Sequence, residues 1–241
     1  MSDTQIKQTT DFDMTVVLTN NKISKKDLRK AEILKAARMI FEECGYEKAK
    51  VAQIAEKVGV VEGTVFHYFG SKQELVVKVM EIFYEEISTD LGIGLKDIKG
   101  FKNRLYFIIW FHFNVLIKNA PLCNVLITEP RKGLNSELKE DIKNFNRRYN
   151  IHFNNLFDKA IANGQIKKNT SRSLVRNTIY GSIESAMWYY LSDGKQINIA
   201  SEANQLTDLI YNGISTTVEQ AINKNEINGL VKKLNNLLTE T

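Results

Sequence analysis

The sequence predicts an all-α protein in which a small N-terminal unit of three helices is joined to a larger C-terminal helical bundle. The chain has 241 residues but only two prolines, Pro121 and Pro130, so few positions would break a helix. Apolar residues recur at spacings of three and four, and almost no stretch alternates as a half-buried strand does. We expect about nine or ten helices, arranged as an N-terminal arm (1–23), the three-helix unit (24–70) and the bundle (71–241).

The three helices of the small unit follow from their caps and apolar spacing. Ser24 can cap the first helix, and Gly45 fits the left-handed residue that follows a helix. The next two helices are predicted at 51–58 and 62–68, with Gly59 in the turn between them. Two short helices around a tight glycine turn are typical of a helix-turn-helix motif. The pattern alone is common in helical proteins.

The bundle is predicted from longer amphipathic segments. These are expected at about 72–91, 101–118, 136–162, 171–191 and 202–222, with a short helix after Pro121 and a leucine-rich segment at 229–238. The segment 101–118 is apolar on nearly every side, which indicates the central helix of the bundle. Its most apolar part is interrupted by His112 and Asn114 and is too short to span a bilayer, so we expect no membrane partner.

Composition excludes several classes of protein. The net charge of +5 and the pI near 9.0 are a mild indication of a polyanionic partner. Cys44 and Cys123 form neither a disulfide framework nor a zinc motif, and no secretory signal is visible, so we expect a cytoplasmic protein. His67, His112 and His152 lie on different segments. We therefore expect no enzyme, no cofactor and no metal site.

Residues 51–80, VAQIAEKVGVVEGTVFHYFGSKQELVVKVM, resemble the TetR family of bacterial transcriptional regulators. The matching features are Ile54-Ala55, Gly59-Val60, Gly63-Thr64, Tyr68-Phe69, Ser71-Lys72 and Leu75. The preceding segment ILKAARMIFEECGYE is similar to the first helix of the family. Three positions depart from the family pattern. Val61 replaces a capping serine worth about 1 kcal/mol, Val51 replaces a capping Thr or Ser, and Phe66 replaces the commoner tyrosine.

The resemblance implies a sequence-specific regulator of transcription that binds a double-stranded DNA operator as a homodimer. It implies a repressor released by a small apolar or aromatic effector, with helices 171–191 and 202–222 forming the dimer interface. The alternative is a helical interaction protein that retains the fold without specific DNA binding. The candidate DNA contacts are Lys50, Glu62, Gly63, Thr64, His67, Tyr68 and Lys72.

Each candidate contact has a chemical reason. Gly63 lets the backbone approach DNA closely, Thr64 offers a hydroxyl and a methyl group, and His67 shares the face of Thr64. Tyr68 and Lys72 can bind phosphates, and Lys50 can add phosphate attraction. Each also has an ordinary explanation, such as a packing glycine or a solvated charge. We expect Phe66 and Phe69 to pack inside the unit.

The resemblance also implies that the effector binds inside the larger bundle. The candidate lining residues are Tyr106, Trp110, Phe113, Asn114, Phe153, Phe157 and Trp188, with His112 and Asn154 as further polar candidates. Each aromatic residue can equally be ordinary core. An apolar, aromatic lining would suit a lipophilic or flat ligand. The segment 129–131, Glu-Pro-Arg, resembles family members that respond to fatty acyl compounds.

Overall fold

The protein is all-α over the residues described by the computed structural model, which are 24–123, 136–193 and 197–216. Within these ranges the one extended pairing is an isolated antiparallel bridge between Ile166 and Ser215. The predicted all-α class is therefore confirmed. The arm at 1–23, the segment 129–131, the leucine-rich segment at 229–238 and most of the short helix after Pro121 lie outside the described residues.

The N-terminal unit consists of three helices. They are α1 (Lys25–Lys48), α2 (Val51–Val58) and α3 (Glu62–Phe69). The predicted cap of α1 is present, since Ser24 Oγ accepts a hydrogen bond from the Asp27 amide at 3.1 Å. Gly45 breaks the helical path with a φ of 75°, after which a short helical segment continues to Lys48. Gly59 adopts a φ of 71° at the end of α2, so the chain can turn at once into α3.

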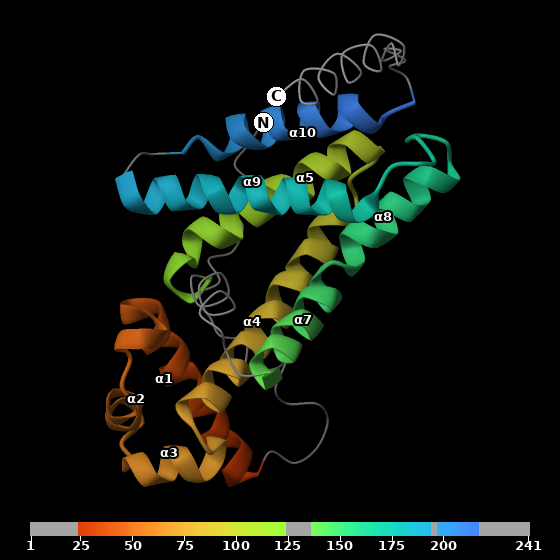
Figure 1. The fold of residues 1–241 in the computed structure, drawn as a ribbon. Coiled ribbons are helices and arrows are strands. Elements are labelled where there is room, and N and C mark those ends of the chain that lie inside the picture. Colours follow the sequence, from red (N-terminus) through yellow and green to blue (C-terminus); the bar gives the residue numbers. More distant parts are fainter. Residues whose placement is uncertain (1–23, 124–135, 194–196, 217–241) are drawn as a thin grey trace, which may run out of the picture.

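The larger bundle is built around one central helix. Its members are α4 (Lys72–Leu95), α5 (Phe101–Lys118), α7 (Ser136–Tyr149), α8 (Ile151–Ala162), α9 (Arg172–Asp193) and α10 (Ile199–Ile214). Helix α4 rises from the N-terminal unit into the bundle with α7 beside it (Figure 1). Helix α5 packs against α4, α8, α9 and α10, as expected of a central helix. None of the helices in the described ranges combines the length and apolar character that a membrane span requires.

Several predicted helix boundaries differ from the structure, including the end of α4, which continues to Leu95 rather than to about 91. The helix expected at 136–162 is divided at Asn150, whose buried side-chain oxygen accepts a hydrogen bond from the Tyr180 hydroxyl at 2.7 Å. The helix expected at 202–222 begins at Ile199, because Asn198 caps it by accepting from the Ser201 amide. It ends at Ile214, where the backbone pairs with the segment around Ile166.

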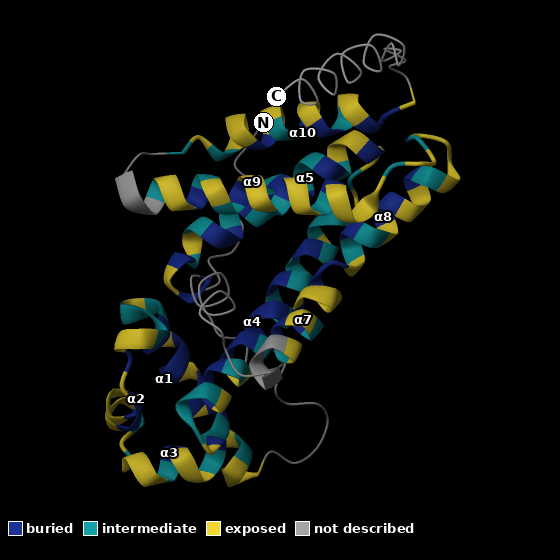
Figure 2. Cartoon of the chain, viewed as in Figure 1, coloured by how far each residue is buried: buried dark blue, intermediate teal, exposed yellow. Residues whose placement is uncertain are grey.

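The apolar core is continuous from the N-terminal unit into the bundle. Figure 2 shows buried positions along α4 and α5, whereas α3 and the outer side of α9 carry many exposed ones. Leu75 near the start of α4 and Leu91 near its end are both fully buried. Helix α4 therefore belongs to both cores.

Candidate DNA-reading face and ligand cavity

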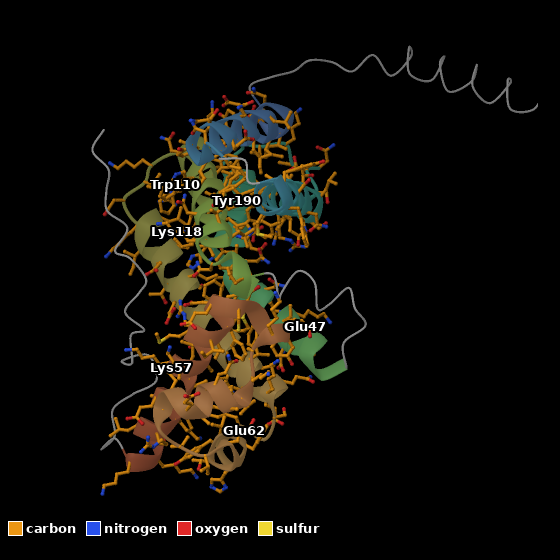
Figure 3. The ribbon with its side chains drawn as sticks, turned by 90° about the vertical axis from the view of Figure 1, so that its left-hand side faces the viewer. Glu47, Lys57, Glu62, Trp110, Lys118 and Tyr190 are labelled. Carbon is orange, nitrogen blue, oxygen red and sulfur yellow. The ribbon has the colours of Figure 1, made fainter. Side chains whose placement is uncertain are left out.

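One face of α3 is anchored and the opposite face is free. Val65 and Phe69 are buried against the rest of the N-terminal unit. Because successive residues of a helix are about 100° apart, Gly63 and His67 point away from that core. Both are exposed, and Thr64 beside them is half-buried. Glu62 lies at the end of the molecule remote from the bundle (Figure 3). This free helical face has the size and position needed to enter the major groove of DNA.

No side chain caps the start of α3. Val61 occupies the N-cap position, its side chain makes no capping hydrogen bond, and it is 73% exposed. The Thr64 amide donates to the Val61 carbonyl at 2.9 Å instead. At α2 the N-cap residue is Lys50 and not Val51 as expected, and the Gln53 side chain accepts a hydrogen bond from the Lys50 amide at 2.9 Å.

The basic and phenolic candidates surround α3. Lys50 is exposed at the start of α2. The Tyr68 ring lies 5.6 Å from the His67 ring in an edge-on arrangement. The Lys72 ammonium is held 4.5 Å from the centre of the Tyr46 ring and donates to the Glu47 carbonyl at 3.4 Å. The seven predicted DNA contacts thus lie at the N-cap of α2, along α3 and at the start of α4.

Phe66 does not pack inside the unit as predicted. It is 41% exposed, whereas Phe69 is buried as expected. The physical reason is helical phase, because a residue one position after Val65 is rotated about 100° from the buried face. Phe66 therefore lies beside His67 on the flank of the free face.

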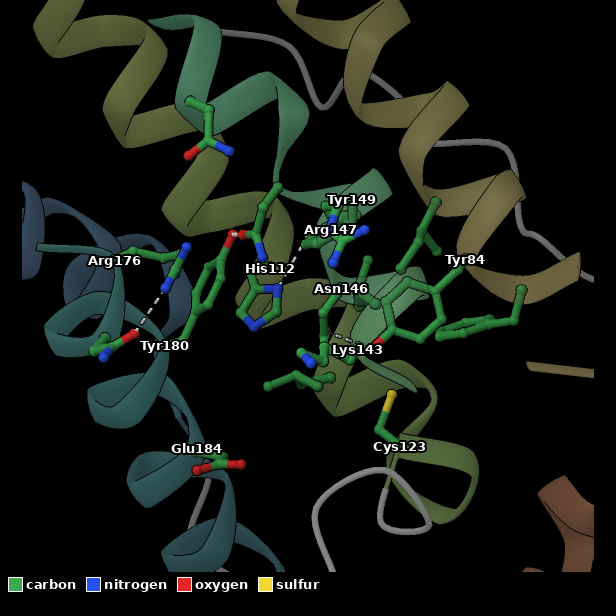
Figure 4. Close-up of a pocket in the computed structure, with 17 residues that line it drawn as sticks. Tyr84, His112, Cys123, Lys143, Asn146, Arg147, Tyr149, Arg176, Tyr180 and Glu184 are labelled. Carbon is green, nitrogen blue, oxygen red and sulfur yellow. Dashed lines mark hydrogen bonds between the residues drawn. The ribbon is translucent and has the colours of Figure 1, made fainter. Parts of the chain in front are cut away.

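The bundle encloses a cavity of about 520 Å³ between α4, α5, α7, α8 and α9. Hydrogen-bonded aromatic side chains line its interior (Figure 4). The His112 ring stacks on Tyr180 with 4.4 Å between ring centres, and His112 Nδ1 lies 3.2 Å from the Tyr149 hydroxyl. The Tyr84 hydroxyl donates to Asn146 Oδ1 at 2.9 Å.

The interior of the cavity is uncharged near neutral pH. Burial lowers the pKa of His112 to about 4, so its imidazole is neutral. Burial also raises the pKa of the three phenols, Tyr84, Tyr149 and Tyr180, well above its ordinary value. It raises the pKa of the Cys123 thiol to about 12. The inner wall therefore suits an apolar or neutral polar group.

Cations lie where the cavity opens to solvent. Lys143 and Arg147 on α7 are exposed, Arg176 on α9 is half-buried, and all three line the cavity. Glu184 on α9 also lines it. The cavity lining thus combines an excess of positive charge at its more exposed residues with an uncharged interior, an arrangement that fits an amphipathic anion.

Two family models match the chain. The model described as "Bacterial regulatory proteins, tetR family" matches residues 33–79. The model described as "YsiA-like protein, C-terminal region" matches residues 76–213, which is more than half of the chain. The chain belongs to the TetR family of bacterial regulatory proteins. The resemblance predicted from the sequence is confirmed, and with it a DNA-binding transcriptional regulator that responds to a ligand.

Similar proteins cover most of this TetR-family chain. The "Fatty acid metabolism regulator protein" of Bacillus subtilis is 26% identical over 183 residues, which are 76% of this chain and 94% of that protein. The solved structure of FadR from Bacillus subtilis in complex with stearoyl-CoA has a TM-score of 0.66 at 24% identity, covering 76% of this chain and 98% of that one.

A solved structure that is not described as a regulator has the same fold. A crystal structure described as superantigen PfiT has a TM-score of 0.64 at 19% identity, covering 81% of this chain and 100% of that one. Identity at this level shows the fold alone. The assignment of this chain as a regulator therefore depends on its family models and on its own site residues.

The effector residues predicted from the sequence are scattered in this TetR-family bundle. His112 and Asn154 line the large cavity. Asn114 lines a separate small void beside Arg38. The other predicted residues lie outside both spaces: Phe113, Phe153 and Phe157 are buried core, Tyr106 and Trp110 are half-buried, and Trp188 is 40% exposed on α9.

The cavity residues that the sequence did not predict come mainly from other helices. They are Tyr84 on α4, Lys143, Arg147 and Tyr149 on α7, and Arg176 and Tyr180 on α9. On α5 only the side that carries His112, Val115 and Leu116 faces the cavity, since its other sides contact the neighbouring helices. The aromatic residues of the segment 101–118 are therefore mostly core rather than cavity lining. Over the described part of the chain, no group of three or more His, Cys, Asp or Glu residues could hold a metal ion.

Proposed function

We propose that this regulator is a homodimeric repressor that leaves its operator when an amphipathic anion of the acyl thioester class fills the bundle cavity. The observation that carries the proposal is the pairing of an uncharged aromatic interior with cations at the opening. This cavity lies against α4, and α4 directly follows α3 in the chain. A ligand that changes the packing of α4 would shift the protein toward a state that does not fit DNA.

The DNA contacts are assigned to the free face of α3 and its surroundings. Gly63, Thr64 and His67 would face the base edges, because they lie opposite the buried side of α3. Tyr68 and Glu62 would lie at the wall of the groove. The two cations, Lys50 and Lys72, would bind phosphates, Lys72 by leaving its contacts with α1.

The ligand class follows from the charge pattern of the cavity. An acyl chain would fill the uncharged interior, and the phosphates of a coenzyme A group would lie near Lys143, Arg147 and Arg176. Two relatives support this choice, one named as a regulator of fatty acid metabolism and one solved with stearoyl-CoA. The tyrosines and His112 give this interior more polar groups than a saturated chain requires, which also suits an aromatic or oxygenated acyl group.

The dimer is assigned to the outer face of α9 with α10. Gly181, Ser182 and Ser185 are small and exposed, and they line a shallow groove that ends at Tyr189, which is 65% exposed. Leu209 on α10 is 69% exposed. Small residues let two helices approach closely, so this groove would accept α9 of a second copy. A two-fold dimer places two copies of α3 on one face of the DNA.

The alternative is a helical interaction protein without specific DNA binding. The family models and the exposed α3 face favour the regulator. We assign the chain no enzymatic activity, and we place it in the cytoplasm, where its DNA partner would be.

One binding experiment tests the regulator against this alternative. Duplexes are selected from a random library by the full-length protein, and binding is measured by fluorescence anisotropy at several salt concentrations. We expect two half-sites related by a two-fold axis, and an affinity that falls steeply as salt rises because phosphate contacts release counterions.

His67→Ala is expected to weaken binding to the selected duplex about 5- to 150-fold, as for the loss of one base contact. The control is Asn155→Ala, at an exposed position of α8, which should bind normally. Failure to enrich any sequence would leave the interaction protein as the better assignment.

A further inference from the structure

The start of α3 exposes apolar surface that folding does not explain. Val61 is 73% exposed and Phe66 is 41% exposed, so neither belongs to the buried core. Single exposed apolar residues are common on proteins. Here, however, both belong to the short segment whose other exposed residues, Glu62, Gly63 and His67, are candidate DNA contacts.

Val61 also forgoes the side-chain capping bond that this chain makes at α1, α4 and α10. Ser24 caps α1 and Ser71 caps α4, each by accepting from a backbone amide, at 3.1 and 3.0 Å. Asn198 caps α10 in the same way at 3.1 Å. A valine at the start of α3 cannot accept such a bond, and it buries little surface in exchange. Neither capping nor packing accounts for Val61.

Gly63 adds a third observation on the same turn of helix. A Cβ atom placed on Gly63 would meet nothing within 4 Å, so the protein itself has room for a side chain there. Gly63 also lies inside α3 rather than in a turn that requires a positive φ. The missing side chain instead leaves space for an external surface to approach the backbone closely.

The apolar group that a major groove offers at its base edges is the C5-methyl group of thymine. Phosphates and the polar base edges would lose water against Val61 or Phe66 without gaining a hydrogen bond. We propose that Val61 and Phe66 determine specificity by contacting thymine methyl groups, so that the preferred half-site carries thymine opposite each of them. This inference rests on the proposed docking of α3 in the major groove.

The test removes one methyl group at a time from the DNA. Each thymine of the selected duplex is replaced singly by deoxyuridine, which keeps every hydrogen-bonding group and lacks only the C5-methyl. At one or two positions per half-site we expect the dissociation constant to rise about three- to fourfold, from the usual gain on burying one methyl group. The other replacements should change it little.

Protein variants then assign the sensitive positions. Val61→Ser and Phe66→Gln are each expected to lose the response to deoxyuridine at one position while still binding the duplex. Val61→Thr, which keeps one methyl group and regains a capping hydroxyl, should retain part of that response. Ile93→Ser is the matched control, because Ile93 is an apolar residue of α4 that is 66% exposed and distant in sequence from α3.

The outcomes separate this inference from the proposed function. Specific binding with no sensitive thymine, or with the same sensitive thymines in Val61→Ser and Phe66→Gln as in the unmodified protein, would overturn the inference and leave the regulator intact. Failure to select any duplex would overturn both. Loss of the deoxyuridine response at one position in each variant, with the Ile93→Ser pattern unchanged, would establish methyl readout.

Discussion

At the scale of single residues, His112 is the cavity side chain whose charge depends most clearly on burial. Its pKa is lowered to about 4, whereas an unfolded chain would titrate near 6.5. Between these values the unfolded state takes up a proton that the folded state does not. Stability should therefore fall as the pH decreases from about 6.5 to about 4, and this contribution should level off below that window.

The variant His112→Gln removes this source of acid sensitivity. We expect its melting temperature to change less between pH 6.5 and 4 than that of the unmodified protein, as measured by scanning fluorimetry. His67→Gln is the control, since His67 is exposed on α3 and lies outside the cavity. Parallel profiles for His112→Gln and the unmodified protein would contradict the assignment to His112.

Residue patterns predicted the free face of α3 better than the cavity. Gly63, Thr64 and His67 could be found because a family motif fixes their places within one short helix. The cavity is formed by side chains from five helices, and the rotation of each helix about its axis is set by packing. The pairing of His112 with Tyr180 therefore could not be predicted from local spacing.

At the scale of helices, Arg38 joins α1 to α4. It is 6% exposed and donates to Glu42 at 2.8 Å and to Glu86 at 2.5 Å. Removing it would leave Glu86 with an unpaired charge in a largely buried position. We expect Arg38→Ala to lower the free energy of unfolding by about 3–5 kcal/mol.

Arg148 on α7 provides a matched control for Arg38 on α1. It also pairs with α4, through Glu81 and Glu85, but its side chain is 49% exposed. We expect Arg148→Ala to cost about 0–1 kcal/mol, because water and salt screen an exposed pair. Urea unfolding of both variants measures the difference. Equal losses of the free energy of unfolding in the two variants would show that burial gives the Arg38 ion pair between α1 and α4 no additional strength.

Helix boundaries were predictable where the signal is local. Helix α2 spans 51–58 as predicted, since Gly59 ends it in any context. The division between α7 and α8 at Asn150 was missed, because its partner Tyr180 lies on α9. The end of α10 was missed for the same reason, since the pairing with Ile166 joins distant segments.

At the scale of the whole molecule, Phe83 connects the cavity to the N-terminal unit. Phe83, Ile87 and Val115 line both the large cavity and the small void beside Arg38. The Arg38 guanidinium lies 5.7 Å from the centre of the Phe83 ring. A ligand that displaces this ring would therefore disturb the contact between α1 and α4, in addition to any movement of α4 itself.

The variant Phe83→Leu tests this connection as a coupling, separately from binding. We expect its affinity for the selected duplex without ligand, and its affinity for stearoyl-CoA, to stay within about threefold of the unmodified protein. The drop in DNA affinity caused by stearoyl-CoA, about 5- to 150-fold for a typical allosteric protein, should shrink toward unity. Phe153→Leu, a buried aromatic change on α8 outside the cavity lining, should retain the full drop. If stearoyl-CoA lowered the DNA affinity of Phe83→Leu as much as that of the unmodified protein, the Phe83 ring would be dispensable for the response. In that case α4 would transmit the signal without Arg38.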